Sequence, residues 1–307
     1  LSHILLSGKT NPTISVGGIL PIIGGNIRVG DSEIFVTEAC EYTNSFLEFF
    51  PKIGIILNVE EDHMDFFKDI DDIRSSFHRF AAKLPQDGTL IVNKNIEQLE
   101  AIVDGLSCRV ITYSETRDAD YTAKNITFDK LGNASFDLVK YGELLGRIQM
   151  SVVGMHNVSN ALSTIAAADI MGIPLESIRD GILSFTGTDR RFQLKGTRNG
   201  VTIIDDYAHH PTEIRASLTS ARNYPHRDIW CIFQPHTYTR TKAFFHEFAE
   251  ALTLADHVIL TDIYAARETD TLGMTSEALA EDVKRLGTDA YYLSSFEEIE
   301  KFVLKKV

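Results

Sequence analysis

The sequence predicts an α/β protein with two domains, each built around a mostly parallel sheet. The chain has 307 residues, which is longer than one typical domain. Apolar segments of strand length alternate with helical segments over residues 34–114, and they do so again over residues 201–305. We therefore expect a central domain over residues 1–187 and a smaller, doubly wound domain over residues 188–307.

Composition narrows the class of partner. A hydrophobic content of 44% and a charged content of 24% are typical of a globular protein. The net charge of −13 argues against nucleic acid, because phosphate backbones are bound by basic surfaces. No apolar run reaches membrane-spanning length, and Cys40, Cys108 and Cys231 lack the spacing of a metal site. These features indicate a cytoplasmic protein with no membrane partner. They leave its oligomeric state open.

The first thirty residues are expected to include a helical start, a turn and a glycine-rich loop. Residues 1–6 are apolar and helix-like. The GKTNPT segment (8–13) resembles part of a phosphate loop, but His3 stands where the first glycine of that loop is required. Asn11-Pro12 also prevents the helix that such a loop precedes, so this segment is predicted to be a turn. The glycine-rich residues 17–30 are expected to form an irregular loop.

Acidic side chains follow two predicted strands of the central domain. Residues 34–39 end at Glu38, and residues 53–59 lead into Glu60, Asp62, His63 and Asp65. We expect these two strand ends to be adjacent, so that together they supply carboxylates and an imidazole that suit Mg²⁺ or Mn²⁺. The alternative is an acid-rich helix start, which the helix dipole favours.

Further elements of the central domain follow from periodicity. Residues 121–153 alternate apolar and polar side chains, with turns near residues 132–133 and 141–142, and predict antiparallel strands. Residues 154–171 predict a helix that starts near His156, Asn157 and Asn160. An asparagine there is expected to cap the helix, although the group could also bind a base or a phosphate. The other expected elements are helix 70–84, strand 89–93, helix 96–104, strand 109–114 and helix 175–183.

The stretch 203–213 (IIDDYAHHPTE) is the most distinctive in the second domain. A buried strand that stops on acids and histidines, with proline at the next helix start, predicts a strand-to-helix turn at the ligand-binding edge of a sheet. Residues 185–193 before it predict a linker. The expected order after the linker is strand 201–205, helix 211–221, strand 229–233, helix 240–254, strand 257–261, helix 275–286, strand 290–293 and helix 297–305.

Polar clusters follow each of the first three strands in this order. They are DDYAHH (205–210), QPHTYTR (234–240) and DIYAARE (262–268). In a parallel sheet these clusters share one edge, which predicts a site built from Asp206, His209, His210, His236, Arg240 and Arg267.

Six segments carry a family resemblance. They are TEACEYTNSFL (37–47), NVEEDHMDFF (58–67), GMHNVSNALS (154–163), TDRRFQ (188–193), DDYAHHPTE (205–213) and FQPHTYTRT (233–241). In this order, over nearly the whole chain, they resemble the Mur ligases, the ATP-dependent amide-forming enzymes of peptidoglycan precursor synthesis. The resemblance implies an ATPase-type central domain and a Rossmann-like carboxy-terminal domain. The last two segments are similar to the branch that joins L-alanine to the lactoyl carboxylate of UDP-N-acetylmuramate.

The resemblance implies a role for each matching residue. Glu38 and His63 are expected to bind Mg²⁺. Asn157, Asn160, Asp206 and Arg191 are expected to contact ATP, with Arg191 near the γ-phosphate. His209 or His210 would act as the base, and Tyr207, His236 and Arg240 would hold the amino acid and the muramoyl carboxylate. The site would be complete when the two domains meet.

The sequence departs from the family pattern at several points. The phosphate loop, the amino-terminal UDP-binding domain and the last carboxy-terminal strand are missing, so this chain is expected to be part of a longer protein. His78 stands where several relatives have a carbamoylated lysine. Thr237 stands where relatives of this branch often have a second arginine.

Three alternatives remain open from the sequence. One is the branch that attaches a recycled tripeptide to UDP-N-acetylmuramate. Another is a metal-dependent hydrolase that uses Glu38, Asp62 and His63. The third is a non-catalytic nucleotide-binding fragment.

Overall fold

The computed structural model describes residues 1–269 and 273–306 and divides into two compact units. Unit 1 comprises Leu1–Asp129 and Asn133–Asp189. Unit 2 comprises Lys130–Gly132 and Arg190–Val307. Each unit has its own sheet and its own hydrophobic core.

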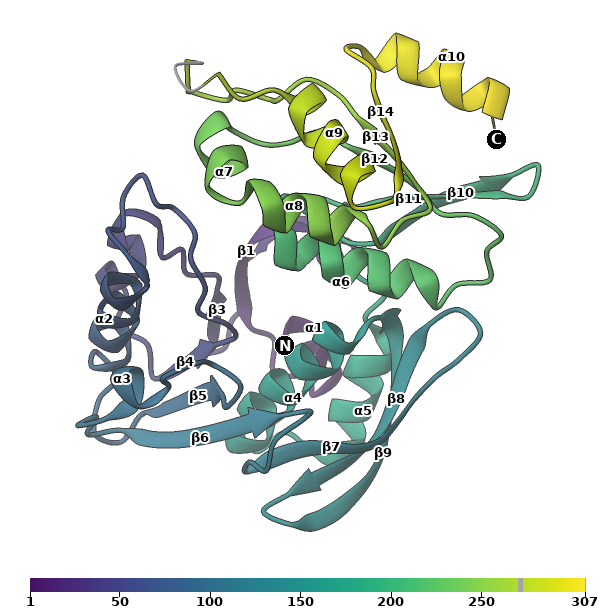
Figure 1. Cartoon of the computed structure of the whole chain (residues 1–307). Coiled ribbons are helices and arrows are strands. Elements are labelled where there is room, and N and C mark those ends of the chain that lie inside the picture. Colours follow the sequence, from purple (N-terminus) through teal and green to yellow (C-terminus); the bar gives the residue numbers. More distant parts are fainter. Residues whose placement is uncertain (270–272, 307) are drawn as a thin grey trace. The chain divides into compact units, whose positions relative to one another are not determined.

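Unit 1 is built on a six-stranded sheet (Figure 1). Its order is β4 (Ile53–Ile56), β5 (Thr89–Asn93), β6 (Arg109–Ser114), β7 (Tyr121–Phe128), β8 (Asn133–Lys140) and β9 (Glu143–Val153). The first four strands are parallel, whereas β8 and β9 are antiparallel to their neighbours. The predicted alternation of strands and helices and the predicted antiparallel segment are both confirmed.

Helices cover both faces of this sheet. Leu90 and Val92 of β5 pack in a core with α2 (Ile70–Ala81) and α3 (Glu100–Val103), whereas Ile91 faces the opposite core. That opposite core contains α1 (Ser2–Ser7), α4 (Met155–Ile170) and α5 (Leu175–Ser184). A strand buried on both faces reads as a continuous apolar run, and this is why TLIV was recognisable in the sequence.

The glycine-rich segment corrects one prediction. Residues 17–30 are not an irregular loop, because β1 (Thr13–Leu20), the 3₁₀ turn η1 (Pro21–Ile23) and β2 (Gly25–Arg28) form an antiparallel pair. Gly24 makes the reversal possible with a left-handed backbone (φ 65°). The alternation of Ile14 and its polar neighbours was the strand signal, and the glycines obscured it.

The predicted strand over residues 34–39 is shorter and lies elsewhere than expected. It becomes β3 (Phe35–Thr37), which pairs in parallel with β1 in a three-stranded sheet of order β2-β1-β3. The expectation that its end adjoins the end of the next strand in one sheet is therefore wrong. The connection to β4 passes through η2 (Tyr42–Glu48), whose backbone is left-handed at Thr43 and Asn44.

The helix predicted over residues 96–104 is mostly absent. Only α3 is helical, because Gln98 adopts a left-handed backbone (φ 52°) that interrupts the periodic pattern. In the GKTNPT segment, Gly8 and Lys9 form a turn after α1, as predicted, and Thr13 already begins β1.

Unit 2 contains a parallel sheet of order β12 (Trp230–Phe233), β13 (His257–Leu260) and β14 (Asp289–Tyr292). Its main core receives α6 (Pro211–Arg222), α8 (Phe245–Leu252) and α9 (Ser276–Arg285). On the opposite face, Phe302 of α10 (Phe296–Lys306) contacts Trp230 and Tyr291. The predicted helix 240–254 is split at Phe244 into α7 (Tyr238–Ala243) and α8.

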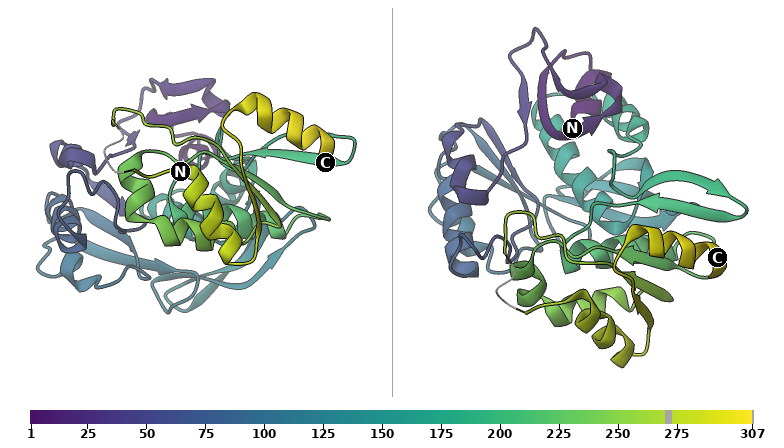
Figure 2. Two further views of the ribbon diagram at one scale, coloured as in Figure 1. Left: turned by 45° about the horizontal axis from the view of Figure 1, so that its top comes forward. Right: turned by 90° about the horizontal axis from the view of Figure 1, so that it is seen from above.

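The strand that ends in the DDYAHH cluster does not join this parallel sheet, which corrects another prediction. It is β11 (Val201–Asp205), and it pairs antiparallel with β10 (Gln193–Arg198), seen as a separate hairpin in Figure 2. Asn199 and Gly200 form the two-residue turn, both with positive φ (51° and 82°). β10 was not predicted, although Asn-Gly between two extended segments is a hairpin signal.

The α/β fold class is confirmed by both units. Within the described parts of the chain, residues 1–269 and 273–306, no helix has the length and apolar character needed to cross a membrane.

Candidate active site

Glu38 lies directly after β3, where its side chain turns back onto β1. Its Oε2 accepts a hydrogen bond from the backbone N–H of Gly17 at 2.7 Å. A Cβ at Gly17 would lie only 2.8 Å from that oxygen, so a larger residue there would make the Glu38 carboxylate shift. Among the described residues, none donates a hydrogen bond to the other oxygen, Oε1. Sequence reasoning missed Gly17, whose only signal was the Gly-Gly pair in the strand.

His63 lies in a turn after β4 with a left-handed backbone (φ 53°). Its Nε2 is 3.4 Å from Oε1 of Glu41, and Tyr42 stacks on its ring with 4.5 Å between centroids. The Tyr42 hydroxyl in turn donates to Asp65 at 2.8 Å. The hydrogen bond from His63 is the main reason that the pKa of Glu41 lies below its ordinary value. A carboxylate that fixes a histidine in this way is common beside metal ligands.

These acids do not form a complete metal cage. Over residues 1–269 and 273–306, no three His, Cys, Asp or Glu side chains come together as a metal-binding group. The hydrolase alternative needed Glu38, Asp62 and His63 to form one such group, so it finds no preformed site in the described chain.

Asn157 and Asn160 lie on the first turns of α4 but do not cap it. The N-cap is Gly154, and no side chain makes a capping hydrogen bond. Asn157 instead donates through Nδ2 to the Val153 carbonyl at 2.8 Å, and Asn160 lies 3.5 Å from Asn157 Oδ1. The predicted cap is therefore wrong, because the amide of Asn157 faces back toward β9 rather than toward the free N–H groups of the helix.

His78 has a structural contact within unit 1. Its Nδ1 donates to the Ile102 carbonyl at 2.9 Å, which ties α2 to α3. A side chain engaged in this way is not a substitute for a metal-bridging carbamoyl-lysine.

In unit 2, Asp206 holds the turn between β11 and α6. Its carboxylate accepts hydrogen bonds from the backbone N–H groups of Phe192 (3.0 Å) and Ala208 (2.8 Å) and from the Ser217 hydroxyl (2.7 Å). Three donors on one carboxylate fix the backbone on both sides of the turn.

Tyr207, His209 and His210 occupy that turn with different ring contacts. His209 donates through Nδ1 to the Tyr207 carbonyl at 2.9 Å, while no described residue bonds to its Nε2. His210 is the N-cap of α6, and its Nδ1 accepts from the Thr212 N–H. The Tyr207 ring lies 5.3 Å from His209 and under the Arg190 guanidinium at 4.7 Å. His210 thus uses a ring nitrogen to cap the helix, whereas Nδ1 of His209 lies 3.4 Å from Oε2 of Glu213 on the first turn of α6.

Glu213 completes this turn and was not predicted as a functional residue. Its Oε2 accepts from the backbone N–H groups of His209 (2.9 Å) and His210 (3.3 Å), and its Oε1 accepts from Arg191 Nη1 at 3.1 Å. The sequence signal was a glutamate three residues after a helix cap, which is the capping-box pattern.

The second and third polar clusters converge on His236. Arg240 Nη1 donates to His236 Nδ1 at 3.1 Å. The Tyr264 ring lies 5.6 Å from His236, and the two residues form an isolated parallel bridge. The ring of His209, which belongs to the first cluster, lies 5.9 Å from the ring of His236 between centroids. All three clusters therefore meet, although β11 does not belong to the parallel sheet.

Thr237 starts α7 with a backbone that is rare for a β-branched residue (φ 65°, ψ 148°). Its Oγ1 accepts from the Arg240 N–H at 3.4 Å, and its N–H donates to the Tyr264 carbonyl at 3.0 Å. These contacts place Arg240 beside His236. Arg267, which the sequence also suggested, is exposed.

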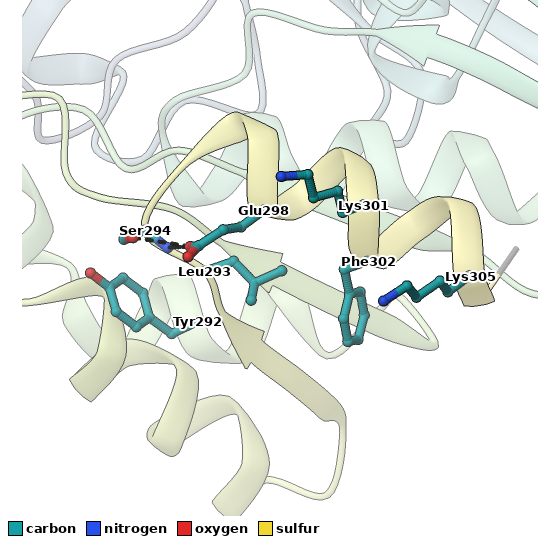
Figure 3. A pocket seen from close by; sticks show the side chains of 7 residues that line it. All are labelled: Tyr292, Leu293, Ser294, Glu298, Lys301, Phe302 and Lys305. Atoms are coloured by element: carbon teal, nitrogen blue, oxygen red, sulfur yellow. Dashed lines mark hydrogen bonds between the residues drawn. The ribbon is translucent and has the colours of Figure 1, made fainter.

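A surface pocket of about 460 Å³ lies elsewhere in unit 2, between the end of β14 and α10 (Figure 3). Glu298 accepts hydrogen bonds from Ser294 at one end of the pocket, and Phe302 and Lys305 line it farther along α10. None of the residues predicted for the site lines this pocket, so its position does not bear on the chemistry above.

Comparisons with known proteins support the family resemblance that rests on the six motifs. The family model of the Mur ligase middle domain matches residues 20–168, and the model described as Mur ligase, glutamate ligase domain matches residues 190–307. The chain belongs to the Mur ligase family. The resemblance stated from the sequence is therefore confirmed.

Individual Mur ligases show where this chain lies in the family. A UDP-N-acetylmuramate–L-alanine ligase of Lachnospira eligens is 56% identical over 306 residues, which are 99% of this chain and 67% of that protein. The solved UDP-N-acetylmuramate–alanine ligase MurC of Thermotoga maritima matches with a TM-score of 0.80 at 28% identity, over 98% of this chain and 64% of that chain.

A more distant structure shares the Mur ligase fold. The murein peptide ligase of Psychrobacter arcticus matches with a TM-score of 0.69 at 24% identity, over 98% of this chain and 67% of that chain, and shows the fold alone. This chain spans about two thirds of the length of the curated relative in Lachnospira eligens.

Proposed function

We propose that the intact protein containing this chain joins L-alanine to the lactoyl carboxylate of UDP-N-acetylmuramate at the expense of ATP. The observation that carries the proposal is the convergence of His209, His236 and Arg240 in unit 2. It occurs in a chain that is 56% identical, over 99% of its length, to a ligase of that name. We place this activity in the cytoplasm, in peptidoglycan precursor synthesis.

The acceptor must be activated before an amine can attack it. A carboxylate is a poor electrophile, and phosphorylation by ATP converts one of its oxygens into a leaving group. The alanine amine then attacks the carbonyl carbon of the acyl phosphate, the C–N bond forms, and inorganic phosphate departs with the C–O bond electrons. The products are the amide, ADP and phosphate.

Glu38 and His63 are proposed to bind Mg²⁺, and their surroundings fit that role. Mg²⁺ is usually held by one or two carboxylates together with the phosphates of a substrate, so an all-protein cage is not required. Glu38 keeps Oε1 available while Oε2 is held by Gly17, and Glu41 fixes the His63 ring. When bound, the metal would neutralise charge on the transferred phosphoryl group.

Four residues are proposed to contact ATP. Asn157 and Asn160 present amides at the start of α4, and Asp206 holds the turn that carries Tyr207. Arg191 has a half-exposed guanidinium that can add positive charge beside the γ-phosphate.

His209 is proposed as the base that takes a proton from the alanine ammonium. Its Nδ1–H is committed to the Tyr207 carbonyl, which leaves Nε2 as the nitrogen that can accept a proton. His210 is the weaker candidate, because its Nδ1 accepts a hydrogen bond from the α6 backbone.

Tyr207, His236 and Arg240 are proposed to hold the substrates. With Nδ1 accepting from Arg240, a neutral His236 carries its proton on Nε2. Arg240 adds a fixed positive charge beside it, which suits the carboxylate of an amino acid.

The test is release of inorganic phosphate from ATP by the intact protein, with each substrate omitted in turn. We expect release only when UDP-N-acetylmuramate and L-alanine are both present. Phosphate release at the same rate with and without L-alanine would contradict the ligase function. A parallel reaction with a murein tripeptide in place of alanine tests the recycling activity, and we expect little turnover there.

A further inference from the structure

Glu213 joins two segments that are distant along the chain. Its Oε1 accepts from Arg191, 22 residues earlier, and its Oε2 accepts from the backbone of the His209–His210 turn. A helix cap accounts for the contacts of Oε2, because a glutamate at this position of a capping box normally reaches back to the cap. It does not account for the contact between Oε1 and Arg191.

The contact with Arg191 adds little stability of its own. The Arg191 side chain is 53% exposed, and ion pairs at such positions are screened by solvent. Burial alone would raise the pKa of Glu213, but the His209 N–H and the charges of His209 and Arg191 outweigh it, and the pKa is lowered. The Glu213 carboxylate is therefore charged at neutral pH. Because the ion pair adds little stability, orientation of the Arg191 side chain explains the contact between Glu213 and Arg191 better than stabilisation of the fold.

The backbone on both sides of Arg191 is already fixed by other contacts. The Arg190 carbonyl accepts from the Tyr207 N–H at 2.7 Å, and the Phe192 N–H donates to Asp206 at 3.0 Å. With its Cα held in this way, Arg191 can still point its long side chain in many directions. The hydrogen bond to Glu213 selects one of them, on the side of the His209 turn.

We propose that Glu213 is a positioning residue that acts through Arg191, by orienting its guanidinium against the His209 turn before the substrates bind. The role of Glu213 rests on the proposed function, in which Arg191 stabilises charge on the transferred phosphoryl group. A guanidinium that is already oriented loses less side-chain freedom when the phosphate arrives. The contribution of Glu213 should therefore depend on the presence of Arg191.

A double-mutant cycle on the intact protein tests this dependence. Glu213→Gln keeps an oxygen for the His209 and His210 N–H groups but loses the charge that holds Arg191. We expect Glu213→Gln to lower kcat roughly tenfold with little change in the KM for L-alanine. In an Arg191→Gln background, the same substitution should cause no further loss. Equal losses in the two backgrounds would show that Glu213 acts independently of Arg191 and would overturn the proposal.

Glu277→Gln is the matched control, since Glu277 is an exposed carboxylate in the first turn of α9 in the same unit. It should leave kcat and its dependence on Arg191 unchanged. Melting temperatures of all variants identify any loss that comes from unfolding.

A second measurement needs no catalysis. The rate at which phenylglyoxal modifies Arg191 in the intact protein, followed by peptide mass spectrometry, should rise several-fold in Glu213→Gln and stay constant in Glu277→Gln. An unchanged rate in Glu213→Gln would show that the carboxylate does not hold the guanidinium. If the wild-type protein released no alanine-dependent phosphate, the proposed function would fail, while this rate would still decide whether Glu213 orients Arg191.

Discussion

At the residue scale, Gly17 decides where the Glu38 carboxylate can lie. A Cβ at Gly17 would meet Glu38 Oε2 at 2.8 Å, whereas a Cβ at Gly18 would meet nothing within 4 Å. We expect Gly17→Ala to displace Glu38 and to raise the Mg²⁺ concentration needed for half-maximal ligation roughly tenfold, as changes near metal ligands often do. Gly18→Ala should leave it unchanged. A titration of activity with Mg²⁺ measures this concentration for both variants. If the two variants needed the same Mg²⁺ concentration, Glu38 would not be a metal ligand.

His210 illustrates how a residue type can suggest chemistry while the structure favours another role. As the N-cap of α6, it should be replaceable by asparagine, which caps helices well. We expect His210→Asn to retain most activity, and His210→Ala to lose about 1 kcal/mol of unfolding free energy. Urea unfolding and kcat measure the two effects. Loss of activity in a stable His210→Asn variant would indicate that His210, and not only His209, takes part in proton transfer.

The residues that meet in unit 2, among them His209, His236 and Arg240, were recognisable from the sequence, because they follow apolar strands or lie within family motifs. Their partners were not. Glu41 reaches His63 and Glu213 reaches Arg191 only through turns with left-handed residues or a helix start, and local patterns do not specify such contacts.

At the element scale, the β10–β11 hairpin depends on its two-residue turn. Gly200 has φ 82°, where a Cβ is strained. We expect Gly200→Ala to cost about 1–2 kcal/mol of unfolding free energy, while Gly200→Asn costs less because asparagine tolerates this conformation. Chemical denaturation measures the difference. Identical stabilities for the two variants would mean that the turn is not left-handed in solution.

Strands buried on both faces could be placed from the sequence, whereas the antiparallel pairings of β10 with β11 and of β1 with β2 could not. β5 contains the fully buried apolar run 90–92 and β13 the fully buried apolar run 258–260, so both strands could be placed from sequence. In β11, Ile203 is 54% exposed, and the pairing with β10 rather than with the parallel sheet depends on a turn and not on hydrophobic pattern. The same holds for β1 and β2, where glycines concealed the alternation.

At the scale of the whole molecule, ionised carboxylates link stability to pH. The pKa of Glu213 is lowered in the folded protein, so its ionised form stabilises the fold above its unfolded pKa, and that stabilisation is lost as the pH falls through the folded pKa. We expect the difference in unfolding free energy between wild type and Glu213→Gln to narrow between about pH 5 and pH 3. Urea unfolding across that range measures it. A difference that stays constant with pH would mean that Glu213 is not selectively stabilised as an anion.

The central claim is that the intact protein activates the lactoyl carboxylate of UDP-N-acetylmuramate as an acyl phosphate and transfers it to L-alanine. The most direct measurement uses UDP-N-acetylmuramate with ¹⁸O in that carboxylate, together with ATP and L-alanine, and analyses the released phosphate by mass spectrometry. We predict that one ¹⁸O atom appears in the inorganic phosphate for each amide formed. Phosphate without the label, or labelled phosphate formed without any amide product, would contradict the account.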